Sequence, residues 1–161
     1  MSNLAKKLKK WDVSKLKMKN GNTVKEELKR HASILADCIM EELDSVYDSY
    51  TPKVYQRSYD LYNSLYIDNV VKIDISTSGV GLSIGIHFDE GAIHKGFSGE
   101  DANTAVLLNE GWQTHGSFSN VPYLGYREGT HFIEQGIEKY KQRVNNPFTV
   151  RFTINNEERI F

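Results

Sequence analysis

Cysteine, proline and long apolar runs are all scarce in this chain of 161 residues. Its single cysteine, Cys38, excludes an internal disulfide framework. No apolar run approaches the ~20 residues that a membrane-spanning helix needs, and the N-terminus lacks the apolar core of a signal peptide. With 39% hydrophobic and 25% charged residues, the composition is that of an ordinary globular domain. We therefore expect one folded domain, made in the cytoplasm, with no membrane among its partners.

The sequence also lacks the spaced motifs of common enzymes. It contains no phosphate-binding glycine loop, no dinucleotide fingerprint and no histidine pair at zinc-protease spacing. Gly96-Phe97-Ser98-Gly99-Glu100 departs from the nucleophile elbow G-x-S-x-G at its last position. We therefore expect a protein that is not an enzyme and that has neither a cofactor nor a metal. One alternative stays open, a small metal-assisted enzyme that uses His87, Asp89, Glu90 and His94.

The net charge of -1 conceals two regions of opposite charge. Residues 1–30 contain ten Lys or Arg against three Asp or Glu, a net of +7, and the remaining residues carry -8. Residues 1–22 form a basic N-terminal arm, and its candidate interface residues are Lys6, Lys7, Lys9, Lys10 and Trp11. Such polarity favours association. It leaves open contact with another copy of the chain, with an acidic partner, or with nucleic acid as a basic-arm nucleic-acid-binding module.

The clearest helix signal starts at residue 23. Thr23 and Glu26 have the spacing of a capping box, in which each residue satisfies an N–H group of the other. Pro52 ends the helical pattern, because the residue before a proline is displaced from helical geometry. A helix of this length spans on the order of 40 Å, so we expect part of its apolar stripe to face a neighbouring subunit. The stripe consists of Val24, Leu28, Ala32, Leu35, Ile39, Leu43, Val46 and Tyr50.

Alternating apolar and polar residues predict three strands, over residues 66–76, 80–88 and 148–154. Ser76-Thr77-Ser78-Gly79 between the first two strands is typical of a hairpin turn. Each strand has one polar face, which favours an antiparallel sheet that is covered on one side.

Two further helices are predicted after the hairpin. The first extends from Asp101, its expected cap, to Glu110, with Gly111 as its stop. The second starts near Thr130 and carries Ile133, Ile137, Tyr140 and Val144 on one face. A short helical turn is expected near residues 58–64. The order α-β-β-α-α-β predicts a single α+β domain over residues 23–161, with its helices packed on one face of a small antiparallel sheet.

The two connections Asp89–Asn103 and Gln113–Gly129 are long for so small a domain. Both are rich in glycine and aromatic residues, a composition that suits contact surfaces. Their candidate interface residues are Phe97, Phe118, Tyr123 and Tyr126.

The long helix is followed in order by three blocks, residues 54–65, 107–112 and 126–134. Together these features, over residues 23–155, resemble the tail-completion and head–tail joining proteins of long-tailed bacteriophages, often called neck or minor capsid proteins. After the lysine-rich start and the long helix, residues 54–65 resemble the block that follows the family's proline. Leu107-Leu108-Asn109-Glu110-Gly111-Trp112 resembles the block that closes in an acidic residue and a glycine. Tyr126-Arg127-Glu128-Gly129-Thr130-His131-Phe132-Ile133-Glu134 resembles the opening of the last helix.

This resemblance implies a structural protein of the virion neck or tail, made in the host cytoplasm. Its copies would form a homo-oligomeric ring at the head–tail junction that joins the tail to the connector. The implied partners are the tail terminator or tube, the head-connector stopper and sibling subunits. DNA would pass through the lumen of such a ring. In a ring, each basic arm could lie on the acidic body of its neighbour.

Overall fold

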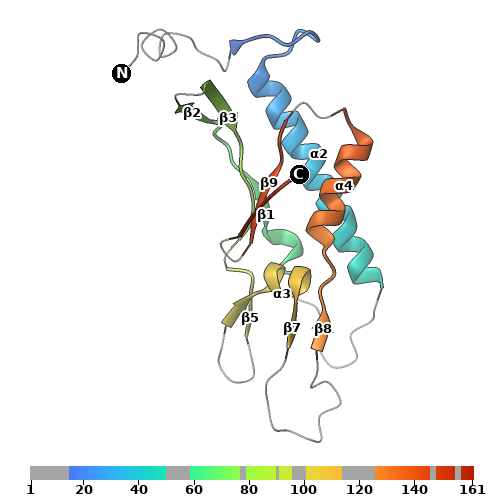
Figure 1. Cartoon of the computed structure of the whole chain (residues 1–161). Helices are drawn as coiled ribbons and strands as arrows, with labels where there is room; N and C mark the ends of the chain where they lie inside the picture. Colours follow the sequence, from blue (N-terminus) through green and yellow to red (C-terminus); the bar gives the residue numbers. More distant parts are fainter. Residues whose placement is uncertain are drawn as a thin grey trace, which may run out of the picture.

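The structure is a computed structural model that describes residues 15–49, 59–76, 79–89, 91–95, 101–113, 126–145, 148–154 and 157–161. The fold is α+β, as the sequence predicted, with a long first helix and two further α-helices in this part of the chain (Figure 1). The elements are α2 (Val24–Asp48), the 3-10 helix η2 (Tyr62–Ser64), β1 (Leu65–Ile67), β2 (Lys72–Ser76), β3 (Gly79–Ser83), β4 (Ile86–Phe88), β5 (Ile93–Lys95), β6 (Asp101–Asn103), α3 (Thr104–Glu110), β7 (Gly111–Gln113), β8 (Tyr126–Glu128), α4 (Phe132–Arg143), β9 (Arg151–Ile154) and β10 (Glu157–Ile160).

Helix α2 begins with the predicted capping box. The Glu26 backbone N–H donates to Thr23 Oγ1 at 3.2 Å, and the Thr23 backbone N–H donates to Glu26 Oε2 at 2.7 Å. The helix ends at Asp48, with Ser49 as its C-cap, before the predicted end at Thr51-Pro52. Its 25 residues span about 37 Å. Within the described ranges, no helix is both long enough and apolar enough to span a membrane.

The apolar stripe of α2 is covered by the chain itself over most of its length. All five stripe residues from Leu28 to Leu43 are buried, and so are Ala36 and Cys38 beside them. The expectation that part of this stripe faces a neighbouring subunit is therefore wrong for residues 28–43. The reason is that α4 and the strands cover α2 on adjoining sides, so the buried face is wider than one row of side chains.

Helix α4 packs directly along α2 (Figure 1). The predicted apolar residues Ile133, Ile137 and Tyr140 are buried in the interface, as is Gly136. A Cβ atom on Gly136 would lie 2.6 Å from Ile39 Cα, so the two backbones approach to a distance that only glycine permits.

Ion pairs close one border of this helix pair. Arg143 of α4 donates from Nη1 and Nη2 to the two oxygens of Glu41 at 2.9 and 2.8 Å. Lys139 Nζ lies 2.9 Å from Glu41 Oε2 and 2.7 Å from Glu42 Oε1. Hydrogen bonds from Arg143 and Lys139 lower the pKa of Glu41 to about 2.

The predicted hairpin forms, but each of its strands is divided. β2 pairs antiparallel with β3, with Ser76 opposite Gly79, which confirms the predicted turn. β1 pairs in the same way with β4, with Leu65 opposite Phe88. Residues 68–71 separate the paired parts on one strand and only residues 84–85 on the other. This mismatch interrupts the ladder and divides the ribbon into two parts.

The sequence predicts a single small sheet, and this prediction is wrong for the described residues. Their strands form five two-stranded antiparallel ribbons instead. Strands β5, β7 and β8 lie in the predicted connections, β6 occupies the start of the predicted helix 101–110, and β10 lies beyond the last predicted strand and pairs with β9. The strands that the sequence did not predict, β5, β6, β7, β8 and β10, are only three or four residues long, too short for an alternating pattern to identify them.

Helix α3 starts later than predicted because Asp101 belongs to strand β6. Asn103 is the cap, and its Oδ1 accepts hydrogen bonds from the N–H groups of Ala105 and Val106 at 2.9 and 3.2 Å. Gly111 ends the helix as predicted, in a left-handed conformation with φ +83°. The main core joins α2, α3, α4 and the residue before η2, and side chains from β4 and β9 pack against it.

Candidate functional site

Two blocks that carry the family resemblance, residues 107–112 and 126–134, meet at the base of ribbon β7/β8. Gly111 pairs with Glu128, and Trp112 pairs with Arg127. The guanidinium of Arg127 lies 4.9 Å from the centroid of the Trp112 ring, a cation–π contact. α3 leads directly into β7, and β8 leads into α4, so helices hold both strands of the ribbon. Figure 1 shows β5, β7 and β8 at one end of the molecule and β2 and β3 at the other.

Two glycines allow the segment from the end of α3 to the start of β7 to lie directly against the segment from β8 to the start of α4. A Cβ atom on Gly111 would lie 2.4 Å from the Arg127 carbonyl oxygen, and one on Gly129 would lie 2.3 Å from the Asn109 carbonyl oxygen. Both contacts are with backbone atoms, which cannot rotate away as a side chain can. The two chain segments therefore cross in van der Waals contact only because these positions carry no side chain.

Asn109 joins the end of α3 to the start of α4. Its side chain is fully buried. Oδ1 accepts a hydrogen bond from the Ile133 backbone N–H at 3.0 Å, and Nδ2 donates to Glu110 Oε1 at 2.8 Å. The backbone strengthens the same junction, because the Thr130 and His131 N–H groups donate to the carbonyls of Leu108 and Asn109 at 2.9 and 3.0 Å.

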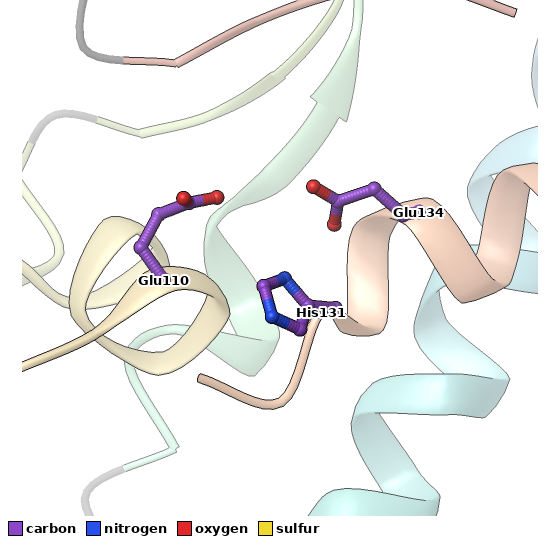
Figure 2. A group of neighbouring side chains, drawn as sticks. All are labelled: Glu110, His131 and Glu134. Carbon is purple, nitrogen blue, oxygen red and sulfur yellow. The ribbon is translucent and has the colours of Figure 1, made fainter. Parts of the chain in front are cut away.

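A cluster of ionisable side chains lies beside this junction (Figure 2). Glu110 comes from the end of α3, and His131 and Glu134 come from the start of α4. One ligand atom from each of the three lies within 4.8 Å of the other two. Arg159 of β10 donates to both carboxylates, from Nη2 to Glu110 Oε2 at 3.1 Å and from Nη1 to Glu134 Oε1.

These contacts fix three of the four carboxylate oxygens. Burial raises the pKa of the Glu110 carboxyl, but the hydrogen bonds from Asn109 and Arg159 more than offset this and lower the pKa overall. Glu134 Oε2 differs from the others, because it is buried and accepts no hydrogen bond from any described residue. The cluster thus presents carboxylate oxygens and an imidazole in one place, together with one buried oxygen available to a cation.

A cavity of about 440 Å³ lies between the helices and the strands. It is lined by side chains of α2 and α4 and by residues 84–88 and 148–154, and most of these are apolar. His31 and Tyr140 also line it, and His31 Nδ1 lies 2.7 Å from the Tyr140 hydroxyl. Burial raises the pKa of Tyr140 to about 12 and lowers the pKa of His31, so both side chains are neutral near pH 7.

Hydrogen bonds to Glu27, whose Oε2 lies 3.6 Å from His31 Nε2, anchor the segment before α2. The buried Glu27 carboxylate accepts hydrogen bonds from Arg30 Nε and Nη2 at 3.0 and 2.9 Å, and from the amides of Asn20 and Asn22 at 2.8 and 2.5 Å. Hydrogen bonds from Arg30 and then Asn22 hold the pKa of Glu27 at about 2. Glu27 thereby fixes where the basic arm joins the folded body.

The lowered pKa values of Glu27 and Glu41 predict a loss of stability in acid. Both groups ionise near 4.5 without these contacts and near 2 with them. Their stabilisation is therefore complete above about pH 5 and is lost as the pH falls toward 2. We expect the free energy of unfolding, measured with urea across this window, to fall with decreasing pH. Glu27→Gln combined with Glu41→Gln should flatten the dependence, and Glu138→Gln, on the surface of α4, is the matched control. An unchanged slope in the double variant would contradict this account.

Most interface residues predicted from the sequence lie outside the described residues: Lys6, Lys7, Lys9, Lys10, Trp11, Phe97, Phe118 and Tyr123. Tyr126 lies in β8 opposite Gln113, and the structure describes its backbone alone. Their contacts with partners therefore stay predictions.

The alternative set of metal ligands is described only in part. His87 Nε2 lies 3.4 Å from Asp68 Oδ1, and Asp89 Oδ1 accepts a hydrogen bond from the Gly91 backbone N–H. Glu90 lies outside the described residues, and only the backbone of His94 is described.

Sequence reasoning missed the cluster of Glu110, His131 and Glu134. The spacing of His131 and Glu134 at the start of a helix was the one available signal, because residues three apart share a helical face. Nothing in the sequence indicated that Glu110 and Arg159, from two other segments, join them.

The family model YomN matches residues 1–153. No curated protein matches the chain. No solved structure matches it either.

Proposed function

The chain belongs to the YomN family, which is phage-derived, and from that premise we propose that it is a structural protein of a tailed-bacteriophage virion. We infer that its copies form a ring at the head–tail junction that joins the tail to the connector. The tail terminator or tube and the head-connector stopper are its proposed partners, and DNA passes through the lumen of the ring.

The observation that carries this proposal is the braced ribbon β7/β8. Its two strands are rooted in α3 and α4 through Asn109, Gly111 and Gly129, so its direction is fixed by the body of the subunit. Ribbon β5/β6 lies at the same end of the molecule (Figure 1). A small helical body with rigidly held ribbons at one end suits a subunit whose function is repeated contact with neighbours.

Charge supports the same function. Asp37, Asp44 and Asp48 are exposed on α2, and their spacing of seven and four residues places them on one face of the helix. We propose that the basic arm of one subunit, through Lys6, Lys7, Lys9 and Lys10, lies on this acidic face of the next. Such a head-to-tail contact repeats from copy to copy and closes into a ring when the rotation permits.

Light scattering of the purified full-length chain tests this arrangement. We expect an oligomer at low salt whose mass falls toward that of a monomer at high salt, because salt screens contacts between exposed charges. Replacing Lys6, Lys7, Lys9 and Lys10 by glutamate should give a monomer at low salt. Replacing the same lysines by arginine keeps the charge and should keep the oligomer.

A charge exchange makes the test specific to the two surfaces. A triple variant with Asp37→Lys, Asp44→Lys and Asp48→Lys and an unchanged arm should also be a monomer. Combining these three substitutions with glutamate at the four arm lysines should restore the oligomer. A wild-type chain that stays monomeric at every salt concentration would contradict self-association. An oligomer that survives both charge reversals would contradict the proposed contact.

A further inference from the structure

We propose that Glu110, His131 and Glu134 bind a divalent ion of the zinc class at the base of ribbon β7/β8. This inference concerns a metal centre and does not depend on the function proposed above. It rests on the position of three donor side chains, on one buried oxygen that accepts no hydrogen bond, and on the groups that orient the carboxylates.

The three donors converge from two helices. A ligand atom from each lies within 4.8 Å of the others, and Figure 2 shows both carboxylates and the imidazole directed into one space between α3 and α4. A modest contraction of the cluster would let one ion lie 2.0–2.2 Å from all three atoms, the distance at which nitrogen and oxygen ligands hold zinc. His131 is placed for this by its left-handed backbone, with φ 51°, directly before α4.

The donor set selects the kind of ion. One imidazole with two carboxylates suits zinc and similar transition metals, whereas magnesium and calcium prefer oxygen ligands alone. Three protein ligands leave one coordination position for water or for a ligand from another molecule.

Three of the four carboxylate oxygens of the cluster already accept hydrogen bonds from the protein. Asn109 donates to Glu110 Oε1, and Arg159 donates to Glu110 Oε2 and Glu134 Oε1. Hydrogen-bonded carboxylates of this kind are the usual outer layer of a metal site. Glu134 Oε2 is the oxygen left over, buried and with no hydrogen-bond donor among the described residues, although the Glu134 side chain as a whole is 18% exposed.

The net charge of the cluster also favours a bound cation. The two carboxylates carry -2, and Arg159 compensates half of it. If Arg159 alone served as the counter-ion, the cluster would be a structural ion pair that needs no metal. The two accounts differ in whether zinc binds at one equivalent and in whether His131 contributes to binding.

Calorimetric titration of the chelator-treated full-length chain with zinc chloride distinguishes the two accounts. We expect one equivalent to bind, and His131→Asn and Glu134→Gln each to weaken the affinity by at least about tenfold, as disturbing the surroundings of a metal ligand does. Asparagine tolerates the left-handed backbone at position 131, so His131→Asn removes the imidazole without straining the turn. His87→Asn removes an exposed imidazole elsewhere and should bind zinc as the wild type does.

Thermal unfolding provides a second readout. Zinc should raise the Tm of the wild type and of His87→Asn, because a ligand that binds only the folded state stabilises it, and at the same zinc concentration it should raise the Tm of His131→Asn by less. Magnesium chloride should leave the Tm of every form unchanged. Absence of zinc uptake by the wild type, a zinc affinity that His131→Asn leaves unchanged, or equal binding of magnesium would each overturn the proposal.

Discussion

Gly136→Ala should destabilise the protein by about 2–3 kcal/mol, the upper part of the range for overpacked cores. The new methyl group would lie 2.6 Å from Ile39 Cα, 2.8 Å from Ile39 Cγ1 and 2.9 Å from the Ile39 backbone nitrogen. Two of these atoms belong to the backbone of α2, so the clash is relieved only by moving one helix away from the other. Urea unfolding of wild type and variant measures the difference.

The direction of the stability change distinguishes a crowded position 136 from an uncrowded one. Alanine is a better helix former than glycine by about 1 kcal/mol, so an uncrowded position 136 would be stabilised by the same change. Gln142→Ala, at an exposed position of α4, is the matched control and should alter stability by less than about 0.5 kcal/mol. A Gly136→Ala variant as stable as the wild type would contradict the close packing of α2 and α4.

Asn109→Ala should cost about 3 kcal/mol. The change leaves the Ile133 N–H buried without its acceptor, a loss of about 1–3 kcal/mol, and it also opens a small cavity. Glu110 loses one of its hydrogen-bond donors at the same time. Because the side chain joins α3 to α4, urea unfolding should show a loss of stability that is large for one polar residue.

Asn103→Ala is the natural comparison. Asn103 also makes two hydrogen bonds through its side chain, but it caps α3 at a partly exposed position. Loss of such a cap typically costs about 1 kcal/mol. If Asn109→Ala costs no more than Asn103→Ala, then Asn109 is not the structural link between the two helices.

The long helix, the hairpin and the last helix could be predicted from the sequence because their signals are local. Thr23 and Glu26 cap α2 through each other, Ser76 and Gly79 close the hairpin, and Ile133 with Ile137 repeats at helical spacing. Each of these signals lies within a few residues of the chain, and the packing of the folded protein favours the same local structure.

The ribbons could not be predicted in the same way. Ile93–Lys95 and Gly111–Gln113 are too short to display alternation, and Gly111–Gln113 pairs with β8 across a long connection. Asp101 illustrates the error, because an acidic residue before an apolar run suggests a helix cap, yet here it pairs with Lys95 in a strand. The actual cap, Asn103, is an equally good capping residue two positions later.

The ionisable cluster shows why a site is harder to predict than a fold. Glu110 ends one helix, His131 and Glu134 begin another, and Arg159 lies in the last strand. Their meeting depends on the direct contact of Gly129 with the end of α3, which follows from packing and not from any local pattern.

Electron microscopy of purified phage particles, with this protein labelled, tests the central claim most directly. We expect a ring of label at the junction of head and tail in intact particles. Particles that lack the protein, or label found at any other part of the virion, would contradict it.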